Sequence, residues 1–258
     1  MFRNVKCINT LKGKLLTWDI LEGHYPVSIA VYGTYDGKGW TLLEGNCDTG
    51  QYLDTVRTIG LEVIYRIVGT DINGHRTTIE NIGAATYDSK AGLIAKEAHR
   101  RETTLFKAHP YGKADVCILM HKQSGTPCSR CSNTIGCPTS GSDTSCPECF
   151  GTGYSGGYYI YPHIEPMLLM DAHDDKLQPP PDLSRNGASQ VFRTAFTGML
   201  REKDILCIGM DLYTVSASQC VSSVAGIPIA YNIQTFKVLP EDIRYKTLLE
   251  RVKNVRLL

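Results

Sequence analysis

The clearest strand signal in this chain is Val27-Ser28-Ile29-Ala30-Val31-Tyr32, where apolar side chains alternate with small or polar ones. Alternation with a period of two is typical of a strand with one buried face, because successive side chains point to opposite faces of a sheet. Similar segments surround it, and we expect strands at 15–20, 40–43 and 61–68 and a turn at Asn73-Gly74. Several short strands separated by turn residues predict a small β-sandwich over residues 1–84.

Two aromatic residues are candidates for the core of this segment. Trp18 and Tyr65 carry large rings, and we expect both to fill the space between two sheets. The order Trp18-Asp19, 27–32, Asp36-Gly37, Trp40 and Tyr65-Arg66-Ile67 resembles a fibronectin type III domain. That resemblance implies a docking or spacer module and no catalytic role for residues 1–84.

Length, composition and net charge limit the classes of protein to which this chain can belong. The chain has 258 residues, a formal net charge of +1, and a composition typical of a globular protein with two or three modules. The small net charge argues against a general nucleic-acid coat, which would be strongly basic. Residues 1–6 lack the apolar core of a signal peptide, and no apolar run reaches the roughly 18–20 residues of a membrane span. We therefore expect neither secretion nor contact with a membrane.

Ten cysteines are unusual in such a chain, and four of them form two close pairs. Cys128-Ser129-Arg130-Cys131 and Cys146-Pro147-Glu148-Cys149 are separated by fourteen residues, close to the spacing of structural zinc sites. Two thiolates two residues apart can bind one ion from a single tight turn, and two such turns complete a tetrahedron. We predict that Cys128, Cys131, Cys146 and Cys149 bind one Zn²⁺. Four thiolates leave no open position, so this zinc would be structural and would supply folding energy.

Alternatives remain open for the two pairs and for the other cysteines. The two pairs could instead be reduced thiols or disulfides on an exposed loop, and Cys137 could replace one of the four ligands or stay free. Cys117 and Cys207 lie in apolar runs and are predicted to be buried thiols. Cys47 and Cys220 lie in polar surroundings and are candidates for disulfides between subunits after cell lysis. Cys7 has no ligand-like spacing.

The rest of the chain divides into three further parts. A helix is predicted from Asp88 to Lys107, within a linker that spans 85–112. Its basic face fits an acidic partner or DNA, but it is also typical of a solvated surface. A zinc-stapled module would span 113–178, up to a linker at Gln178-Pro179-Pro180-Pro181. A small β-barrel or sandwich with a basic tail would span 179–258, so the predicted class is mainly β.

Motifs for catalysis are missing from the sequence. It contains no phosphate-binding glycine loop, no nucleophile elbow and no zinc-protease motif. His163, Glu165 and His173, with the acidic residues at 171–175, could serve a metal-dependent hydrolase, but nothing places a nucleophile beside them. We interpret 171–175 as a solvated loop, and we expect no enzyme.

Two further resemblances concern the cysteine region. Residues 146–153 resemble one C-x-x-C-x-G-x-G unit of the zinc domain of J-type co-chaperones. More widely, the fibronectin-like start, the basic helix around 95–102 and the segment from Pro127 to Tyr159 look like structural proteins of tailed-bacteriophage virions. Residues 200–215 look like the small barrels of head–tail joining proteins.

The virion resemblance implies a function. The chain would be a structural subunit of the neck or head–tail connector, assembled in the host cytoplasm, forming a homo-oligomeric ring and docking on other virion proteins. The alternatives are a tail or baseplate component, or a zinc-ribbon accessory protein that binds nucleic acid. Residues 125–161 hold one Arg and no Lys, against Asp143 and Glu148, so direct DNA contact is not favoured.

Overall fold

The computed structural model of this protein describes residues 1–35, 38–55, 63–83, 89–109, 113–132, 146–170 and 189–256. Strands dominate these residues, which confirms the predicted mainly-β class. The chain divides into two compact units. The first holds residues 1–92 and 122–159, and the second holds 93–121 and 160–258.

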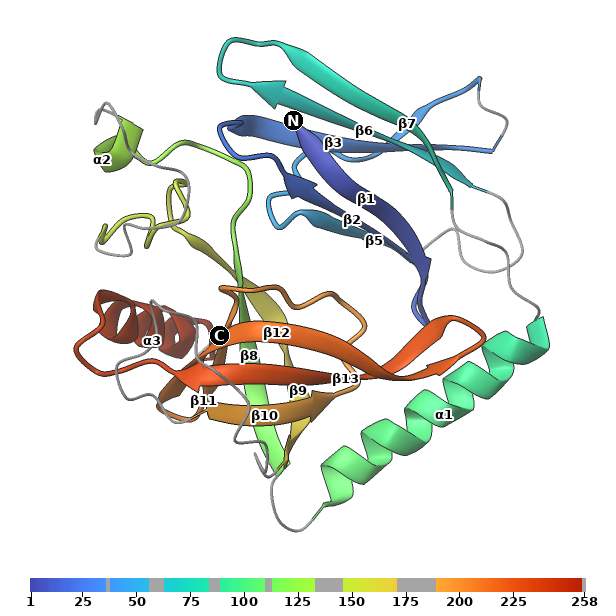
Figure 1. Ribbon diagram of the computed structural model, residues 1–258, viewed down its shortest axis with the longest axis vertical. Helices are drawn as coiled ribbons and strands as arrows, with labels where there is room; N and C mark the ends of the chain where they lie inside the picture. The colour runs from blue at the N-terminus through green and yellow to red at the C-terminus, as the bar shows by residue number, and fades with distance from the viewer. Residues whose placement is uncertain are drawn as a thin grey trace. The chain divides into compact units, whose positions relative to one another are not determined.

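Seven antiparallel strands of the first unit form two sheets (Figure 1). The three-stranded sheet has the order β1 (Phe2–Asn9), β2 (Lys14–Ile20), β5 (Gln51–Asp54). The four-stranded sheet has the order β4 (Thr41–Glu44), β3 (Pro26–Thr34), β6 (Ile64–Asp71), β7 (Arg76–Gly83). The predicted turn at Asn73-Gly74 joins β6 to β7, and Gly74 adopts a φ of 80°, which favours glycine. Fibronectin type III domains share this architecture of two antiparallel sheets.

One hydrophobic core joins these two sheets. Trp18 on β2 and Tyr65 on β6 are fully buried in it, as predicted, together with Leu16 and Ile67. The Tyr65 hydroxyl donates a 2.9 Å hydrogen bond to Oδ2 of Asp54, which is also buried. The phenol therefore fills the core with its ring and satisfies a buried carboxylate with its polar end.

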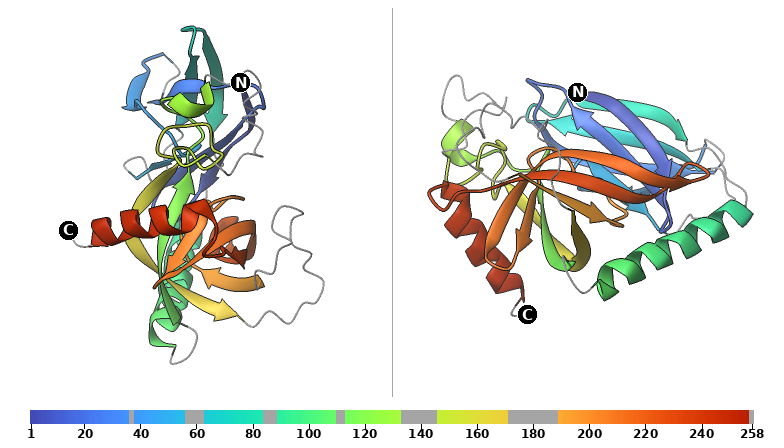
Figure 2. Two further views of the ribbon diagram at one scale, coloured as in Figure 1. Left: turned by 90° about the vertical axis from the view of Figure 1, so that its left-hand side faces the viewer. Right: turned by 60° about the horizontal axis from the view of Figure 1, so that its bottom comes forward.

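The second unit contains a closed barrel (Figure 2). Its strands follow the order β10 (Ser189–Thr194), β13 (Ile227–Lys237), β12 (Asp211–Val224), β11 (Ile205–Ile208), β8 (Lys113–His121), β9 (Tyr158–Met170). Strands β10 to β13 come from the range predicted to hold a small barrel, whereas β8 and β9 come from the range assigned to the zinc-stapled module. The cysteine segment is thus inserted between two barrel strands.

Three helices complete the described residues: α1 (Ser89–Ala108), α2 (Ser129–Ser132) and α3 (Ile243–Arg256). The predicted helix at 88–107 is confirmed by α1. The predicted basic tail, for which the sequence allows a helical turn at 245–256, forms the 14-residue helix α3, because Leu248, Leu249 and Val252 form an apolar stripe at helical spacing and are buried. Within the described ranges no helix is both long and apolar enough to span a membrane.

Cys137, the linker at 178–181 and the acidic segment at 171–175 lie outside the described residues.

Candidate metal centre

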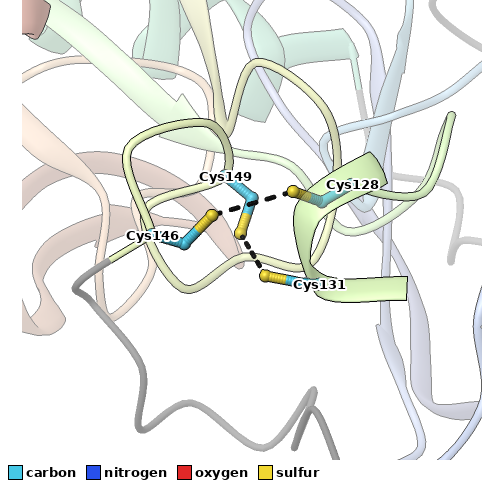
Figure 3. Close-up of side chains that lie close together, drawn as sticks. All are labelled: Cys128, Cys131, Cys146 and Cys149. Carbon is cyan, nitrogen blue, oxygen red and sulfur yellow. Dashed lines mark hydrogen bonds between the residues drawn. The ribbon is translucent and has the colours of Figure 1, made fainter. Parts of the chain in front are cut away.

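The four paired cysteines lie together in one cluster (Figure 3). All four Sγ atoms lie within 4.8 Å of one another. The Sγ atoms of Cys128 and Cys146 are 3.8 Å apart, and those of Cys131 and Cys149 are 3.5 Å apart. Four sulfurs at the usual Zn–S distance of about 2.3 Å form a tetrahedron with edges of about 3.8 Å. The cluster therefore has the size of a four-thiolate metal site.

Tight turns place the sulfurs within each pair. Cys128 comes directly before the single-turn helix α2, which contains Cys131. In the second pair the N–H of Phe150 donates to the carbonyl of Cys146 at 2.9 Å, and the N–H of Thr152 donates to the carbonyl of Cys149 at 3.0 Å. The chain leaves this turn through Phe150 and Gly151, which have positive φ angles of 52° and 82°. The glycine that follows the second pair thus relieves part of the strain of the exit.

Hydrogen bonds also join the two pairs to each other. Pro127 and Tyr154 form an antiparallel bridge, and the N–H of Cys128 donates to the carbonyl of Gly153 at 2.8 Å. The Ser129 hydroxyl donates to Oε2 of Glu148 at 2.9 Å. Each pair therefore holds the other in position, which reduces the ordering that a bound ion would have to impose.

The environment shifts the pKa values of two thiols of the cluster in opposite directions. Burial raises the pKa of the Cys128 thiol to about 11. Burial acts in the same direction on Cys146, but backbone N–H groups of Cys149 and Glu148 and the neighbouring thiols outweigh it and lower its pKa to about 7. One sulfur of the cluster is thus close to ionisation at neutral pH. The others would lose their protons to the solvent when a cation binds.

The segment before the cluster is attached to the N-terminal sandwich. The N–H of Gln123 donates to the carbonyl of Asp48 at 2.7 Å, and the buried Ser124 hydroxyl donates to the carbonyl of Cys47 at 2.9 Å. Lys122 Nζ lies 3.9 Å from Asp48 Oδ2. These contacts explain why residues 122–159 belong to the first unit, although β8 and β9 on either side belong to the barrel.

The cysteines outside the cluster differ in burial. Cys117 and Cys207 are buried, as predicted. Cys47 is also buried, within the sandwich core, which argues against the predicted disulfide between subunits: its polar neighbours in the sequence do not make its own side chain accessible. Cys220 is exposed.

Other predicted site residues do not form a second centre. His163 is exposed and Glu165 is half-buried on β9, and His173 lies outside the described residues. Tyr154 and Tyr158 are buried, and the ring centroids of Tyr158 and Phe150 are 6.1 Å apart, which fits packing beside the cluster. In the part of the chain that the structure describes, no other group of three or more His, Cys, Asp or Glu side chains converges as a metal site.

One polar pair with a buried carboxylate was not predicted. His121 Nδ1 lies 2.6 Å from Oδ1 of Asp204, and the same oxygen accepts a hydrogen bond from the N–H of His121 at 2.9 Å. The N–H of Arg201 donates to the other carboxylate oxygen at 2.8 Å. These partners lie far apart in the sequence, and no motif joins them. The pair fixes the end of β8 to the loop before β11.

Comparison with protein-family models, with curated proteins and with solved structures finds no match for this chain.

Proposed function

We propose that the four cysteines bind one structural Zn²⁺ and that the protein is a non-enzymatic assembly subunit. The observation that carries this proposal is the closed set of four sulfurs at tetrahedral spacing. Zinc favours four-thiolate coordination of this kind, and such sites leave no position for a substrate or a catalytic water. Because iron also binds four thiolates, the identity of the metal is part of the test.

The metal would stabilise the two cysteine turns directly. Their small core consists of Cys128, Cys146 and Cys149, with Cys131 partly buried beside them. A bound ion would replace sulfur–sulfur contacts by metal–sulfur bonds and add its binding free energy to folding. Since Ser124 and Gln123 attach the cysteine segment to the sandwich, an ordered metal centre would also order that junction.

The assembly role is supported by an exposed apolar surface on α1. Leu93, Ile94 and Leu105 each expose more than half of their surface, and with Ile229 of β13 they line a groove of about 750 Å³. Exposed apolar patches of this kind mark protein contacts. The exposed cations Lys96 and Lys107 on the same helix favour an acidic neighbour.

The location that we propose rests on the resemblance of the sequence to tailed-phage structural proteins. We propose a ring of identical subunits in the neck or head–tail connector of a virion, in contact with other virion proteins and assembled in the host cytoplasm. The zinc centre and the two β units would act there as rigid parts that present surfaces to neighbouring subunits.

Elemental analysis and electron microscopy of the purified full-length protein test this function together. We expect one zinc per chain, ring-shaped oligomers and co-purification with virions. Leu93→Glu should disperse the rings, because it places a charge in the exposed groove, whereas Ile72→Glu, at an equally exposed position in the β6–β7 turn, should leave them intact. A metal-free monomer would contradict the proposal. Binding of DNA that weakens steeply with salt would favour the nucleic-acid alternative.

A further inference from the structure

Two cysteines stand directly opposite each other in the barrel wall. Strands β8 and β11 run antiparallel, and their register pairs Cys117 with Cys207, between the pairs Ile118–Leu206 and Val116–Ile208. Residues opposite each other in an antiparallel ladder have Cα atoms about 4.5–5.5 Å apart. Disulfides span Cα distances of about 4.4–6.8 Å, so this register meets their first geometric requirement.

The two thiols also lie on the same face of the wall. Val116, Ile118 and Leu206 belong to the barrel core, and neighbouring residues of a strand point to opposite faces. Cys117 and Cys207 therefore share the outer face, where both are nevertheless buried. The first turn of helix α3 lies against the turn that follows β11. There the Tyr245 hydroxyl donates to the carbonyl of Met210 at 2.8 Å (Figure 1).

We propose that Cys117 and Cys207 are a modification site, a dithiol that closes to an intrachain disulfide under oxidising conditions. No other direct Cys–Cys pair occurs in the strand registers of the described residues: Cys7 stands opposite Leu16, and Cys220 stands opposite Tyr231. The selectivity of the reaction would thus come from register and not from exposure. None of this depends on the metal centre or on the assembly role.

The chemistry balances with a small-molecule disulfide such as oxidised glutathione as the oxidant. The thiolate of one cysteine attacks a glutathione sulfur, the glutathione S–S bond breaks, and one glutathione thiolate leaves with the electron pair. The second cysteine thiolate attacks the protein sulfur of the mixed disulfide and expels the second glutathione. The two cysteines lose two electrons and two protons, and one glutathione disulfide becomes two glutathione thiols.

Burial sets the conditions for this reaction. A thiol that is almost fully covered reacts only when the wall is transiently uncovered, so closure should be slow in the native protein and should speed up as local opening becomes frequent. A chain made in a reducing compartment would carry the open dithiol and would gain a cross-link between β8 and β11 when it enters an oxidising one.

Mass spectrometry of the full-length protein tests the proposal. The protein is equilibrated in glutathione buffers of increasing oxidised fraction, at several temperatures below unfolding, and then alkylated in denaturant and digested with trypsin. Cleavage after lysine gives the peptides 114–122 and 204–237. We expect these two peptides to become linked, with the loss of two alkylatable thiols, and fragmentation to place the link between Cys117 and Cys207.

Matched variants separate this link from others. Cys220→Ala should leave the Cys117–Cys207 link intact, because Cys220 shares the peptide 204–237 but stands opposite Tyr231. Cys207→Ala and Cys117→Ala should each abolish the link. The wild-type link is itself the readout, so the test does not depend on the folding of either variant. Full alkylation of both cysteines in the most oxidising buffer, or a link through Cys220, would overturn the proposal.

Discussion

The hydroxyl of Ser124 donates a 2.9 Å hydrogen bond to the carbonyl oxygen of Cys47, and both residues are buried. Ser124 lies shortly before the first cysteine pair, whereas Cys47 belongs to the core of the N-terminal sandwich. This contact therefore joins the candidate metal segment to the hydrophobic core of the sandwich. It makes the stability of the junction measurable by substitutions far from the sulfurs.

The first prediction concerns this junction. Ser124→Ala should lower the free energy of unfolding by about 1–2 kcal/mol, because a buried carbonyl loses a hydrogen-bond donor. Thr104→Ala is a suitable control, since its hydroxyl bonds to a carbonyl within an exposed turn of α1. Denaturant titration of the three proteins measures the effect. Equal stability of the two variants would show that this hydrogen bond contributes nothing.

Removal of one metal ligand should abolish stoichiometric zinc. Cys149→Ser replaces a buried sulfur of the cluster by a weaker ligand, and only three thiolates remain. Cys220→Ser, at an exposed cysteine outside the cluster, should retain one zinc per chain. Elemental analysis after gel filtration distinguishes the two. Hydrogen exchange should rise at the N–H groups of Cys128 and Ser155 in the first variant alone, because these amides join the two cysteine turns. Unchanged zinc content in Cys149→Ser would refute this ligand set.

Tyr65→Phe should destabilise the sandwich by about 1–3 kcal/mol, because the buried Asp54 carboxylate loses the phenol that donates to it. Tyr159→Phe removes the same hydroxyl from a half-exposed ring and should change the free energy of unfolding by less than about 0.5 kcal/mol. Thermal unfolding followed by circular dichroism compares the two. A neutral Tyr65→Phe would mean that water replaces the phenol at Asp54.

Stability near α3 should depend on pH through Asp242. Burial opposes ionisation of this carboxyl, but the Arg244 side chain, with hydrogen bonds of 2.6 to 3.1 Å, and the N–H of Arg244 outweigh it and lower its pKa. A carboxyl with a lowered pKa stabilises the folded state above its unfolded value of about 3.9, and this contribution is lost as the pH falls through the folded value. Asp242→Asn should therefore cost about 1–2 kcal/mol at pH 7 and progressively less below about pH 4. Urea titrations of both proteins from pH 7 to pH 3 measure the difference, and a cost independent of pH would contradict the ion pair.

Short sequence patterns identified the features of this molecule that depend only on residues close together in the chain. The C-x2-C spacing selected the four cysteines that the structure brings together, because a single turn determines where two thiols two residues apart can point. Alternation and turn residues located β3 and the β6–β7 turn, since the period of a strand is a property of its own backbone. The burial of Trp18 and Tyr65 followed from the size of their rings.

Only the tertiary structure revealed what depends on distant partners. It showed that β8 and β9, on either side of the cysteine segment, close the same barrel, and that Cys117 stands opposite Cys207 on neighbouring strands of that barrel. It also placed His121 beside Asp204 and Ser124 beside Cys47. The sequence by itself therefore determined several of the strands and the four cysteines of the candidate site, whereas the pairings between segments emerged only from the fold. The physical reason is that strand register and buried hydrogen bonds are selected by the packing of the whole core, and no short window of residues contains that information.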